Sequence, residues 1–317
     1  MLTGGLSLAS AAALLGLIAV NASSAGAAVT VGQTFTPEQD FGGSGVFIQS
    51  GSPDNSYTIP TDGVITSWSF EAIGSEATPP LKLKVVRHAG GDDFTTLGDS
   101  QLQTPNPGVL NAWPTRIAVK AGDLLAHFYS DSTFGYRSPP GYKTNEISGS
   151  PGDPSLDPPP GTTITYEPPS ASSHQHDLAV VLESDGDRDD FGDETQDKCL
   201  GTPGSFSGCP NTVRIDKLKQ MGETKVKVTA SVPGAGTLAV GSPGDKKLAS
   251  ASAKALKAVK RTITGTSQQT VTLTVKLTKS GSGSSPTSGS SRSRLKAVYT
   301  PLGGPPGSSI KKKKLKS

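Results

Sequence analysis

Hydrophobic and polar residues alternate in short segments along the first half of the chain. Between residues 81 and 85 a period of two places Leu81, Leu83 and Val85 on one face of a strand and two lysines on the other. Glycine, proline, aspartate and serine separate such segments, and no helical period lies between them. This predicts an antiparallel β-sandwich, jelly-roll-like in form, over residues 29–183. Its strands are expected at residues 45–49, 63–70, 81–86, 116–120, 123–129 and 177–182.

The alternation returns after residue 210, now with lysine and threonine at the polar positions. Residues 224–232 and 270–277 show it most clearly, and residues 294–299 offer a further strand. In the second of these segments the residues predicted to face inward are Val271, Leu273, Val275 and Leu277. We therefore expect a second, smaller sandwich of immunoglobulin-like character over residues 211–317, which makes the predicted fold all-β.

Four segments depart from this alternation. A proline-rich excursion at residues 139–169 is expected to form a long surface loop, and residues 251–259 form the one plausible helix. The glycine- and serine-rich residues 279–293 predict a mobile loop, and the lysine-rich residues 311–316 predict an exposed basic tail. None of the four changes the predicted fold class.

The N-terminal residues predict export. Apolar residues 6–20 precede a run of small residues, and cleavage near Ala27 or Ala28 fits the small-residue preference of signal peptidases, so residues 1–28 are expected to be a signal peptide. A buried N-terminal helix is the alternative. No later segment approaches 18 consecutive apolar residues, so we expect no transmembrane span in the mature chain, which should be secreted or held at the cell surface.

Charge divides the chain into two opposite parts. The net charge of the 317 residues is +3, but residues 1–210 hold 9 Lys and Arg against 24 Asp and Glu, whereas residues 211–317 hold 21 against 3. The hydrophobic share of 33%, with 38 Gly and 25 Pro, argues against a long helical bundle and against a polytopic membrane protein. The two parts should attract each other or bind different partners, in a salt-dependent manner.

Between the two predicted sandwiches, residues 185–199 carry seven acidic residues in fifteen positions. The first three aspartates stand at positions 1, 3 and 5 of a loop; in an EF-hand-type loop these positions, a backbone carbonyl at 7 and a ligand at 9 surround one hard cation with oxygen. The predicted ligands are the carboxylates of Asp185, Asp187, Asp189, Asp193 and Asp197 and the backbone carbonyl of Phe191, with Glu194 as the alternative to Asp197. We expect Ca²⁺ here; a solvated acidic linker without metal is the other interpretation.

The same connector, residues 184–210, contains both cysteines of the chain. Cys199 and Cys209 lie close in sequence and follow a predicted export signal, so we expect one disulfide between them. A structural zinc site would need about four ligands, and the chain has no second pair of cysteines.

The connector resembles a thrombospondin type 3 repeat, whose aspartate-rich loop D-x-D-x-D-G ends in Asp-x-Cys. The residues that carry the resemblance are Asp185, Asp187, Asp189, Asp197 and Cys199. The chain departs from the repeat at Asp190, which replaces the glycine of the sharp turn, and by one extra residue between Asp193 and Asp197. The resemblance implies calcium binding, and with the export signal and the two sandwiches it implies a modular secreted bacterial protein with an adhesive or scaffolding role.

Aromatic residues are concentrated at one place in the first predicted sandwich. Of the 17 in the chain, five lie within residues 128–142, and aromatic faces beside polar groups suit sugar rings. The candidate glycan contacts are Tyr129, Tyr136 and Tyr142. A carbohydrate-binding module is therefore the alternative function, although the same tyrosines could pack at the base of the proline-rich excursion. Trp68 alternates with Val64 and Phe70 and is expected in the core.

The chain contains none of the G-x-S-x-G, H-E-x-x-H and P-loop motifs of enzymes. The lysines of residues 211–317 alternate with apolar residues, and no aromatic stacking platform accompanies them, so we expect attachment to an anionic cell-envelope polymer or an extracellular glycan and no nucleic acid. The sequence thus predicts a secreted or cell-surface, non-enzymatic calcium-binding adhesion or scaffold protein. A hydrolase would need two carboxylates facing one groove, and the sequence pairs none.

Overall fold

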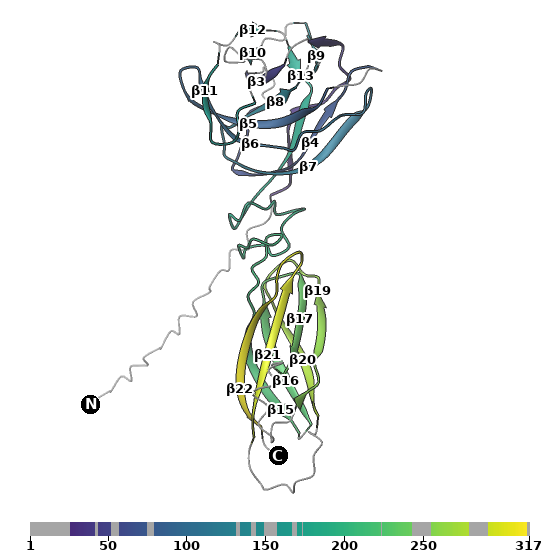
Figure 1. Ribbon diagram of the computed structural model, residues 1–317, viewed down its shortest axis with the longest axis vertical. Helices are drawn as coiled ribbons and strands as arrows, with labels where there is room; N and C mark the ends of the chain where they lie inside the picture. Colours follow the sequence, from purple (N-terminus) through teal and green to yellow (C-terminus); the bar gives the residue numbers. More distant parts are fainter. Residues whose placement is uncertain are drawn as a thin grey trace, which may run out of the picture.

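The computed structural model describes most of the chain, and this part is all-β, as predicted. It contains antiparallel sheets and, within the described residues, no helix. Figure 1 shows two groups of sheets at opposite ends of an elongated molecule, with a narrow connector between them. The described residues are 26–41, 44–51, 57–74, 79–130, 134–140, 144–148, 157–166, 170–172, 174–222, 224–242, 255–278 and 291–315.

The N-terminal group consists of antiparallel sheets. Its strands are β1 (Val29–Gln33), β2 (Gln39–Phe41), β3 (Gly45–Gly51), β4 (Gly63–Glu71), β5 (Leu81–Gly90), β6 (Asp93–Asp99), β7 (Leu110–Val119), β8 (Leu124–Tyr129), β9 (Phe134–Arg137), β10 (Thr144–Ser148), β11 (Thr163–Thr165), β12 (Ser170–Ser172), β13 (Gln175–His176) and β14 (Leu178–Glu183). They form a four-stranded sheet in the order β1-β14-β4-β7, a seven-stranded sheet in the order β11-β6-β5-β8-β3-β10-β12, and a three-stranded sheet in the order β13-β9-β2.

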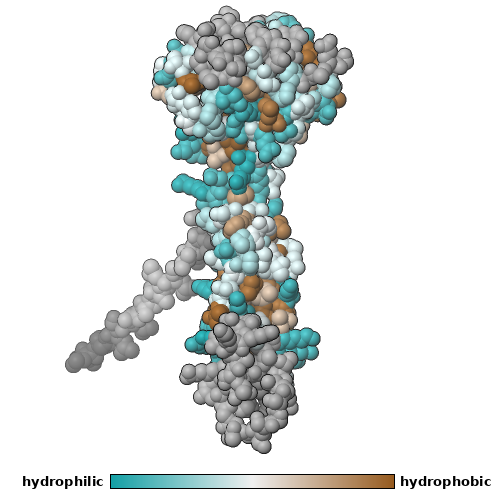
Figure 2. Space-filling model, viewed as in Figure 1, coloured by the Kyte–Doolittle hydropathy of each residue, from teal (hydrophilic) through white to brown (hydrophobic). Residues whose placement is uncertain are grey.

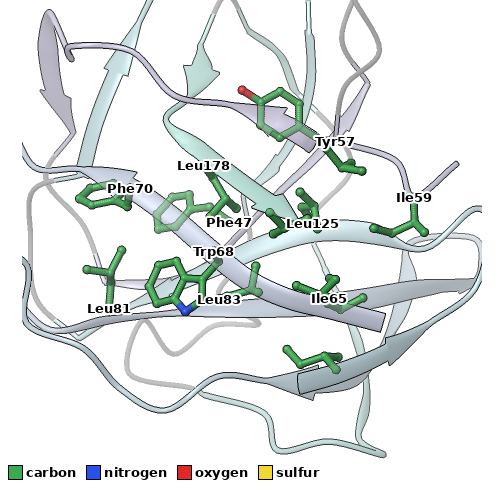
Figure 3. Packing of buried hydrophobic residues seen from close by; sticks show 14 of the residues in the cluster. Phe47, Tyr57, Ile59, Ile65, Trp68, Phe70, Leu81, Leu83, Leu125 and Leu178 are labelled. Carbon is green, nitrogen blue, oxygen red and sulfur yellow. The ribbon is translucent and has the colours of Figure 1, made fainter. Parts of the chain in front are cut away.

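The hydrophobic core of this group lies between the four-stranded and the seven-stranded sheets (Figure 3). Trp68 of β4 packs there with Leu81 and Leu83 of β5. Leu81, Leu83 and Val85 are all 0% exposed, which confirms the inward face predicted for this strand. Trp68 is also in the core as expected, and its ring centroid lies 4.5 Å from that of Trp113 on the neighbouring strand β7.

The inward face of β4 differs from the prediction in one respect. Ile65 belongs to the core cluster together with Trp68 and Phe70, whereas Val64, which is also 0% exposed, lies outside that cluster. The register between β4 and β7 shifts between Ile65 and Ser67, and such a β-bulge inserts one residue and so reverses which side chains face inward. Simple alternation along the strand therefore did not predict that Ile65 packs in the same cluster as Trp68.

The outer face of β5 is also covered, which the alternation did not predict. Lys84 is 0% exposed: its Nζ lies 2.6 Å from an Asp157 carboxylate oxygen and donates a hydrogen bond to the Pro158 carbonyl at 2.9 Å. The chain after Pro158 continues over this outer face of the sheet, where Tyr166 packs against Phe94. The second lysine of the strand, at position 82, is half-buried beside the same acid. A buried ammonium is tolerated here because carboxylate and carbonyl oxygens surround it.

These contacts correct the interpretation of residues 139–169 as a surface loop. β10 lies within the excursion and pairs with β3 and β12, and β11 pairs with β6. The excursion therefore extends the seven-stranded sheet and covers its outer face. Residues 141–143, 149–156 and 167–169 lie outside the described part of the chain.

Asp177 is a buried carboxyl just before β14. Its oxygens accept hydrogen bonds from the backbone N–H groups of Phe35 at 2.9 Å and Glu71 at 2.5 Å. Burial raises the pKa of Asp177 from 3.8 to about 7, although these two donors and the charge of Arg137 oppose the rise. Ionised Asp177 therefore opposes folding at neutral pH.

We expect Asp177 to make the protein less stable as the pH rises from about 4 to about 7. Its folded pKa lies above the unfolded one, so the folded state binds the proton more tightly and loses that advantage when the proton leaves. Asp177→Asn cannot ionise and should remove this part of the decline. Urea unfolding of both proteins at about pH 5 and about pH 8 measures it. A stability difference between the two that does not change with pH would contradict the assignment.

The C-terminal group is a sandwich of two four-stranded sheets. Its strands are β15 (Arg214–Met221), β16 (Lys225–Val232), β17 (Gly236–Gly241), β18 (Ala255–Leu256), β19 (Val259–Ile263), β20 (Gln269–Thr278), β21 (Ser291–Pro301) and β22 (Gly307–Leu315). The sheet orders are β15-β16-β20-β18 and β19-β17-β21-β22. In chain order, the long strands occupy the A-B-E and C-F-G positions of an immunoglobulin-like sandwich. Val271, Leu273 and Val275 face the core between the sheets as predicted; the side chain of Leu277 lies outside the described ones.

Three smaller expectations about this sandwich need correction. The described part of the predicted helix at 251–259 is extended, because β18 and the first residue of β19 fall within it; residues 251–254 lie outside the described part. The predicted loop at 279–293 overlaps the start of β21, and its residues 279–290 are likewise not described. The lysine-rich segment is no free tail: β22 pairs with β21, and the Lys311 ammonium donates to the Asp216 carbonyl at 2.8 Å.

The predicted signal peptide falls almost entirely outside the described residues, which begin at residue 26. Within the described part of the chain, no helix is long and apolar enough to span a membrane.

Candidate metal site in the connector

The connector is held against the N-terminal sandwich by a buried carboxylate. Glu183, the last residue of β14, is 1% exposed and accepts hydrogen bonds from the backbone N–H groups of Glu194 and Thr195 at 3.0 and 2.9 Å. The hydroxyls of Thr195 and Thr66 donate to its other oxygen at 2.7 and 2.9 Å. Burial alone would raise the pKa of Glu183, but these hydrogen bonds outweigh it and hold the pKa below its ordinary value.

Two further contacts join the same surfaces. The Arg116 guanidinium of β7 lies over the Phe191 ring, 4.1 Å from its centroid. The side-chain amide of Gln196 donates to the Thr115 carbonyl at 2.7 Å. The acidic loop is therefore packed on the base of the first sandwich by polar and aromatic contacts together.

We expect Glu183→Gln to loosen this docking and to destabilise the protein by about 2 kcal/mol, because hydrogen bonds to a carboxylate are roughly twice as strong as neutral ones. Urea unfolding gives the free energy, and the rate of protease cleavage within the connector gives the local effect. Glu38→Gln, at an exposed position, is the control. Equal behaviour of the two variants would contradict the docking role.

The connector also contacts the C-terminal sandwich. The Lys198 carbonyl accepts a hydrogen bond from the Ala235 N–H at 3.1 Å, and Leu200 forms a parallel β-bridge with Ser267. The buried Tyr299 hydroxyl donates to the Ala235 carbonyl at 2.7 Å. Both ends of the connector are thus joined to folded sheets by hydrogen bonds. Figure 1 shows the connector as the narrow part of the molecule between the two groups of sheets.

The predicted disulfide is present and closes a second loop beside the acidic one. Cys199 and Cys209 are bonded and fully buried. The N–H of Gly204, inside this loop, donates to an Asp189 carboxylate oxygen at 2.9 Å. Gly208 packs so closely that a Cβ would lie 1.8 Å from Asp197 Oδ1, and its φ of +74° also requires glycine. The disulfide loop and the acidic loop therefore form one unit.

Asp185, Asp187 and Asp189 come together as the spacing predicted. Each offers a carboxylate oxygen, and these oxygens lie within 4.8 Å of one another. Two oxygens bound to one Ca²⁺ at about 2.3–2.6 Å each can be separated by at most about 5 Å, so the separation suits one shared cation. Asp185 also accepts hydrogen bonds from the N–H groups of Asp189 and Asp190 at 3.1 and 2.9 Å, which close the loop around the three carboxylates.

Asp187 has no hydrogen-bond donor on either carboxylate oxygen, and both oxygens are buried. Burial, followed by the charges of Asp189 and Asp185, raises the pKa of Asp187 to about 6. The Thr202 N–H faces it and opposes the rise, but this N–H donates its hydrogen bond to the Cys199 carbonyl at 3.0 Å. Buried carboxylate oxygens without donors are costly unless a cation satisfies them.

Asp197 presents a second unsatisfied oxygen. It is 1% exposed; its Oδ1 accepts the Cys199 N–H at 2.6 Å, while its buried Oδ2 has no donor. Burial raises the pKa of Asp197 to about 7, and the charges of Asp189, Asp187 and Asp193 add to the rise. Asp197 itself lies outside the group of three mutually close carboxylates. These orphaned oxygens fit a bound cation.

The remaining predicted ligands have other contacts. Both oxygens of Asp193 accept the Gly186 N–H, at 3.2 and 3.1 Å, and one also accepts the Ser184 hydroxyl at 3.1 Å. Asp193 therefore closes the loop onto its own start and lies outside the group of three mutually close carboxylates. A Glu194 carboxylate oxygen accepts the Ala28 N–H instead. The carbonyl of Phe191 stays a predicted ligand.

The backbone at Asp190 adopts a left-handed conformation, which glycine favours. Its φ is +66°, and Arg188 also has a positive φ of +62°. Residues other than glycine are strained in this region of backbone conformation, and aspartate and asparagine are strained least. Asp190 thus forms a left-handed turn of the kind that glycine adopts most readily.

We expect Asp190→Gly to stabilise the metal-free protein by up to about 1 kcal/mol, because glycine removes the left-handed strain while keeping the N–H that donates to Asp185. Asp190→Ala is the matched control, since it removes the same carboxylate and retains the Cβ. Urea unfolding in the presence of a chelator measures both. A glycine variant no more stable than the alanine variant would contradict a strained turn.

Tyr129 and Tyr136 do not form the predicted sugar-binding face. Tyr129 is 0% exposed and packs edge-on against Phe47 and Phe70 in the core, and Tyr136 is 9% exposed and belongs to the same cluster. Both side chains point into the core from β8 and β9. The alternative interpretation, that these tyrosines pack inside the protein, is therefore the one that applies to Tyr129 and Tyr136. Tyr142 lies outside the described residues.

Several contacts that build the site were not predicted. Glu183 was predicted only as the last residue of the first sandwich, and the Gly204–Asp189 hydrogen bond joins residues in two different loops. A scan against protein-family models finds no match to this chain, and a search of curated proteins finds none either. What the connector can do chemically therefore follows from its own geometry: it can hold one hard cation with carboxylate oxygens.

Proposed function

We propose that this chain is an exported, non-enzymatic scaffold or adhesion protein whose connector binds Ca²⁺ and thereby orders the joint between two β-sandwiches. The observation that carries the proposal is the Asp185–Asp187–Asp189 cluster, in which both buried oxygens of Asp187 lack a hydrogen-bond donor. A buried oxygen of Asp197, in the same connector, also lacks one. The resemblance of the connector to a thrombospondin type 3 repeat points in the same direction.

The donor set favours calcium over other metals. The clustered ligand groups are carboxylates, and neither a histidine nor a free cysteine belongs to the group among the described residues. Hard oxygen ligands on a flexible loop suit Ca²⁺, whereas Zn²⁺ prefers nitrogen and sulfur and Mg²⁺ tolerates less variation in geometry. When bound, the ion would supply positive charge and no redox or acid–base chemistry. By analogy with extracellular modules the dissociation constant should be about 10⁻⁴ to 10⁻³ M.

A metal at this position would act on the joint itself. The acidic loop is packed on the first sandwich through Glu183 and Arg116, and the adjoining disulfide loop contacts the second through Lys198. Without a cation, repulsion among the carboxylates favours opening of the loop that lies between these contacts. With a cation, the same carboxylates hold the loop closed, so the two sandwiches keep one relative orientation.

Calorimetric titration with CaCl₂ and small-angle scattering test this proposal on the mature protein. We expect one binding event per chain, and a narrower distribution of interdomain distances in millimolar Ca²⁺ than in chelator. MgCl₂ at the same concentration is the ion control. Scattering curves that are identical with chelator and with Ca²⁺, together with no heat of binding, would overturn the proposal.

The C-terminal sandwich supports the second part of the function, attachment to an anionic polymer. Residues directly opposite in an antiparallel pair share a face, and like charges there repel. Among the described residues, exposed pairs of this kind include Lys219 with Lys227, Lys225 with Lys276, and Arg294 with Lys312. Residues 211–317 contain three acids to balance them, Asp216, Glu223 and Asp245. A linear polyanion lying along these strands would neutralise the repulsion.

The surface of this part of the molecule fits such an electrostatic contact. In Figure 2 hydrophobic side chains are scattered in small groups among hydrophilic ones on the face shown. Lysine, a flexible point charge, dominates over arginine in residues 211–317, which favours charge attraction over a fixed bidentate geometry. We propose that the polymer is a component of the cell envelope, because an exported protein meets such polymers first.

Binding to inorganic polyphosphate, used as a simple linear polyanion, tests this part. We expect affinity to fall steeply with salt, and Lys227→Glu to weaken binding more than Lys120→Glu, which makes the same charge change at an exposed position of the first sandwich. Equal effects of the two variants would contradict a surface on the C-terminal sandwich. Preferential binding of duplex DNA over polyphosphate at matched salt would point to a nucleic-acid partner instead.

A further inference from the structure

The backbone just before β1 lies along the acidic connector. The Gly26 N–H donates to the Ser184 hydroxyl at 3.1 Å, and the Ala28 N–H donates to a Glu194 carboxylate oxygen at 2.5 Å. β1 then begins at Val29, which pairs with β14. The residues that link the export segment to the first sandwich therefore touch the loop that carries the metal ligands.

Glu194 is one carboxylate within a strongly acidic stretch, and the group that it contacts at Ala28 is a neutral amide N–H. The nearby Lys198 ammonium is directed to the Thr195 carbonyl at 2.5 Å. Hydrogen bonds between a carboxylate and a cation are shorter and stronger than those with a neutral donor. A positive charge at the Ala28 nitrogen would therefore strengthen the contact already present.

The sequence provides a way to create that charge. Ala25 and Ala27 stand three residues and one residue before the peptide bond that precedes Ala28, and small residues at these two places are what export peptidases prefer. Cleavage one bond later would remove Ala28 and its contact with Glu194. Cleavage two bonds earlier would leave Gly26 first and keep a neutral amide at Ala28.

We propose that the mature chain begins at Ala28 and that its α-ammonium group forms an ion pair with Glu194. An export peptidase would hydrolyse the Ala27–Ala28 amide with one water molecule, leaving a carboxylate on Ala27 and an amine on Ala28. An α-amine has an ordinary pKa of about 7.7–8.0, so it carries a proton at neutral pH. The proposal rests on the export included in the proposed function, and it makes processing the step that completes the connector.

The N-terminal sequence of the exported protein tests the position of the cut. The full chain, expressed with its leader in an exporting bacterium, is recovered from the medium or the envelope and analysed by intact mass and N-terminal sequencing. A first residue of Ala28 supports the proposal, and any other first residue overturns it. Retention of the whole chain in the cytoplasm overturns the export itself.

The ion pair is tested separately on chains made without export. One chain starts at Ala28, released from a fusion by a protease that leaves no extra residue, and the other starts at Gly26. Each is prepared with Glu194 and with Glu194→Gln, and α-amine acylation near pH 7 is followed by mass spectrometry. In the Ala28 chain we expect Glu194 to slow labelling, by up to about fivefold, because pairing keeps the amine protonated. In the Gly26 chain the substitution should have no effect.

Asp190→Asn in the Ala28 chain is the matched control, since it removes the same charge from an exposed residue of the connector. Slower labelling that depends on Glu194 and on an Ala28 start supports the ion pair. Equal labelling of the Glu194 and Gln variants overturns it, as does an effect of the same size from Asp190→Asn. All labelling is done in chelator, so these outcomes are distinct from failure of the metal site.

Discussion

Replacing Asp187 by asparagine is expected to weaken Ca²⁺ binding by about tenfold or more while making the metal-free protein more stable. In the absence of metal, the two Asp187 oxygens are buried without donors and are repelled by Asp185 and Asp189. Removing that charge should raise the free energy of unfolding in chelator by about 1 kcal/mol. With metal, the same substitution removes a charged ligand. The two effects have opposite signs, which a merely structural aspartate or a solvated linker would not produce.

Calorimetry gives the dissociation constant, and urea unfolding with chelator gives the stability of the metal-free protein. Asp190→Asn serves as the control because it makes the same charge change at an exposed residue outside the cluster. Similar dissociation constants for the two variants would exclude Asp187 as a ligand. A metal-free Asp187→Asn protein less stable than the wild type would mean that the Asp187 carboxylate makes favourable contacts in the metal-free fold, and would contradict this prediction.

Removal of the disulfide is expected to reduce both stability and metal affinity. Closure of the short loop between Cys199 and Cys209 stabilises the fold by a little under about 3 kcal/mol on the chain-entropy argument. The loop also positions two acids, through the Gly204 N–H on Asp189 and the Cys199 N–H on Asp197. The double variant Cys199→Ser, Cys209→Ser should therefore unfold at lower urea concentration and bind Ca²⁺ several-fold less tightly.

Thermodynamic linkage requires the reverse effect as well. If an intact disulfide strengthens Ca²⁺ binding, bound Ca²⁺ must make the disulfide harder to reduce by the same factor. Titration of the wild-type protein with dithiol redox buffers, with Ca²⁺ and with chelator, measures this shift. Reduction that is indifferent to Ca²⁺, combined with unchanged Ca²⁺ affinity in the serine variant, would show that the two loops are not coupled.

The acidic and basic parts of the chain occupy different parts of the structure. The acidic part contains the connector and the first sandwich, and the basic residues lie on the outward faces of the second. A bound Ca²⁺ ion would neutralise part of the negative charge of the connector. The α-ammonium of Ala28, a group of the chain itself, would neutralise another part. The joint would then be completed only after export, where Ca²⁺ and the processing enzyme meet the chain.

Some features of this protein follow from its sequence alone. The strands at residues 81–86, 224–232 and 270–277 are correct because a period of two is a local property of an extended chain. Asp185, Asp187 and Asp189 converge because their side chains, at alternate positions of one tight turn, can all reach the same point. The disulfide was predictable for the same reason, since its cysteines are few and close in sequence.

Other features were decided by residues that are distant in sequence, and no local pattern reports them. Lys84 is buried because Asp157 and Pro158 cover it, and Ile65 shares the core cluster of Trp68 because the pairing with β7 contains a bulge. The docking of Glu183 on the connector likewise depends on how sheet and loop meet in space. Alternation and spacing determine which segments become strands and which carboxylates lie close together, because both depend only on the local geometry of the backbone. Burial, register and the partners of each charge require the folded chain, because they depend on which surfaces the packing brings together.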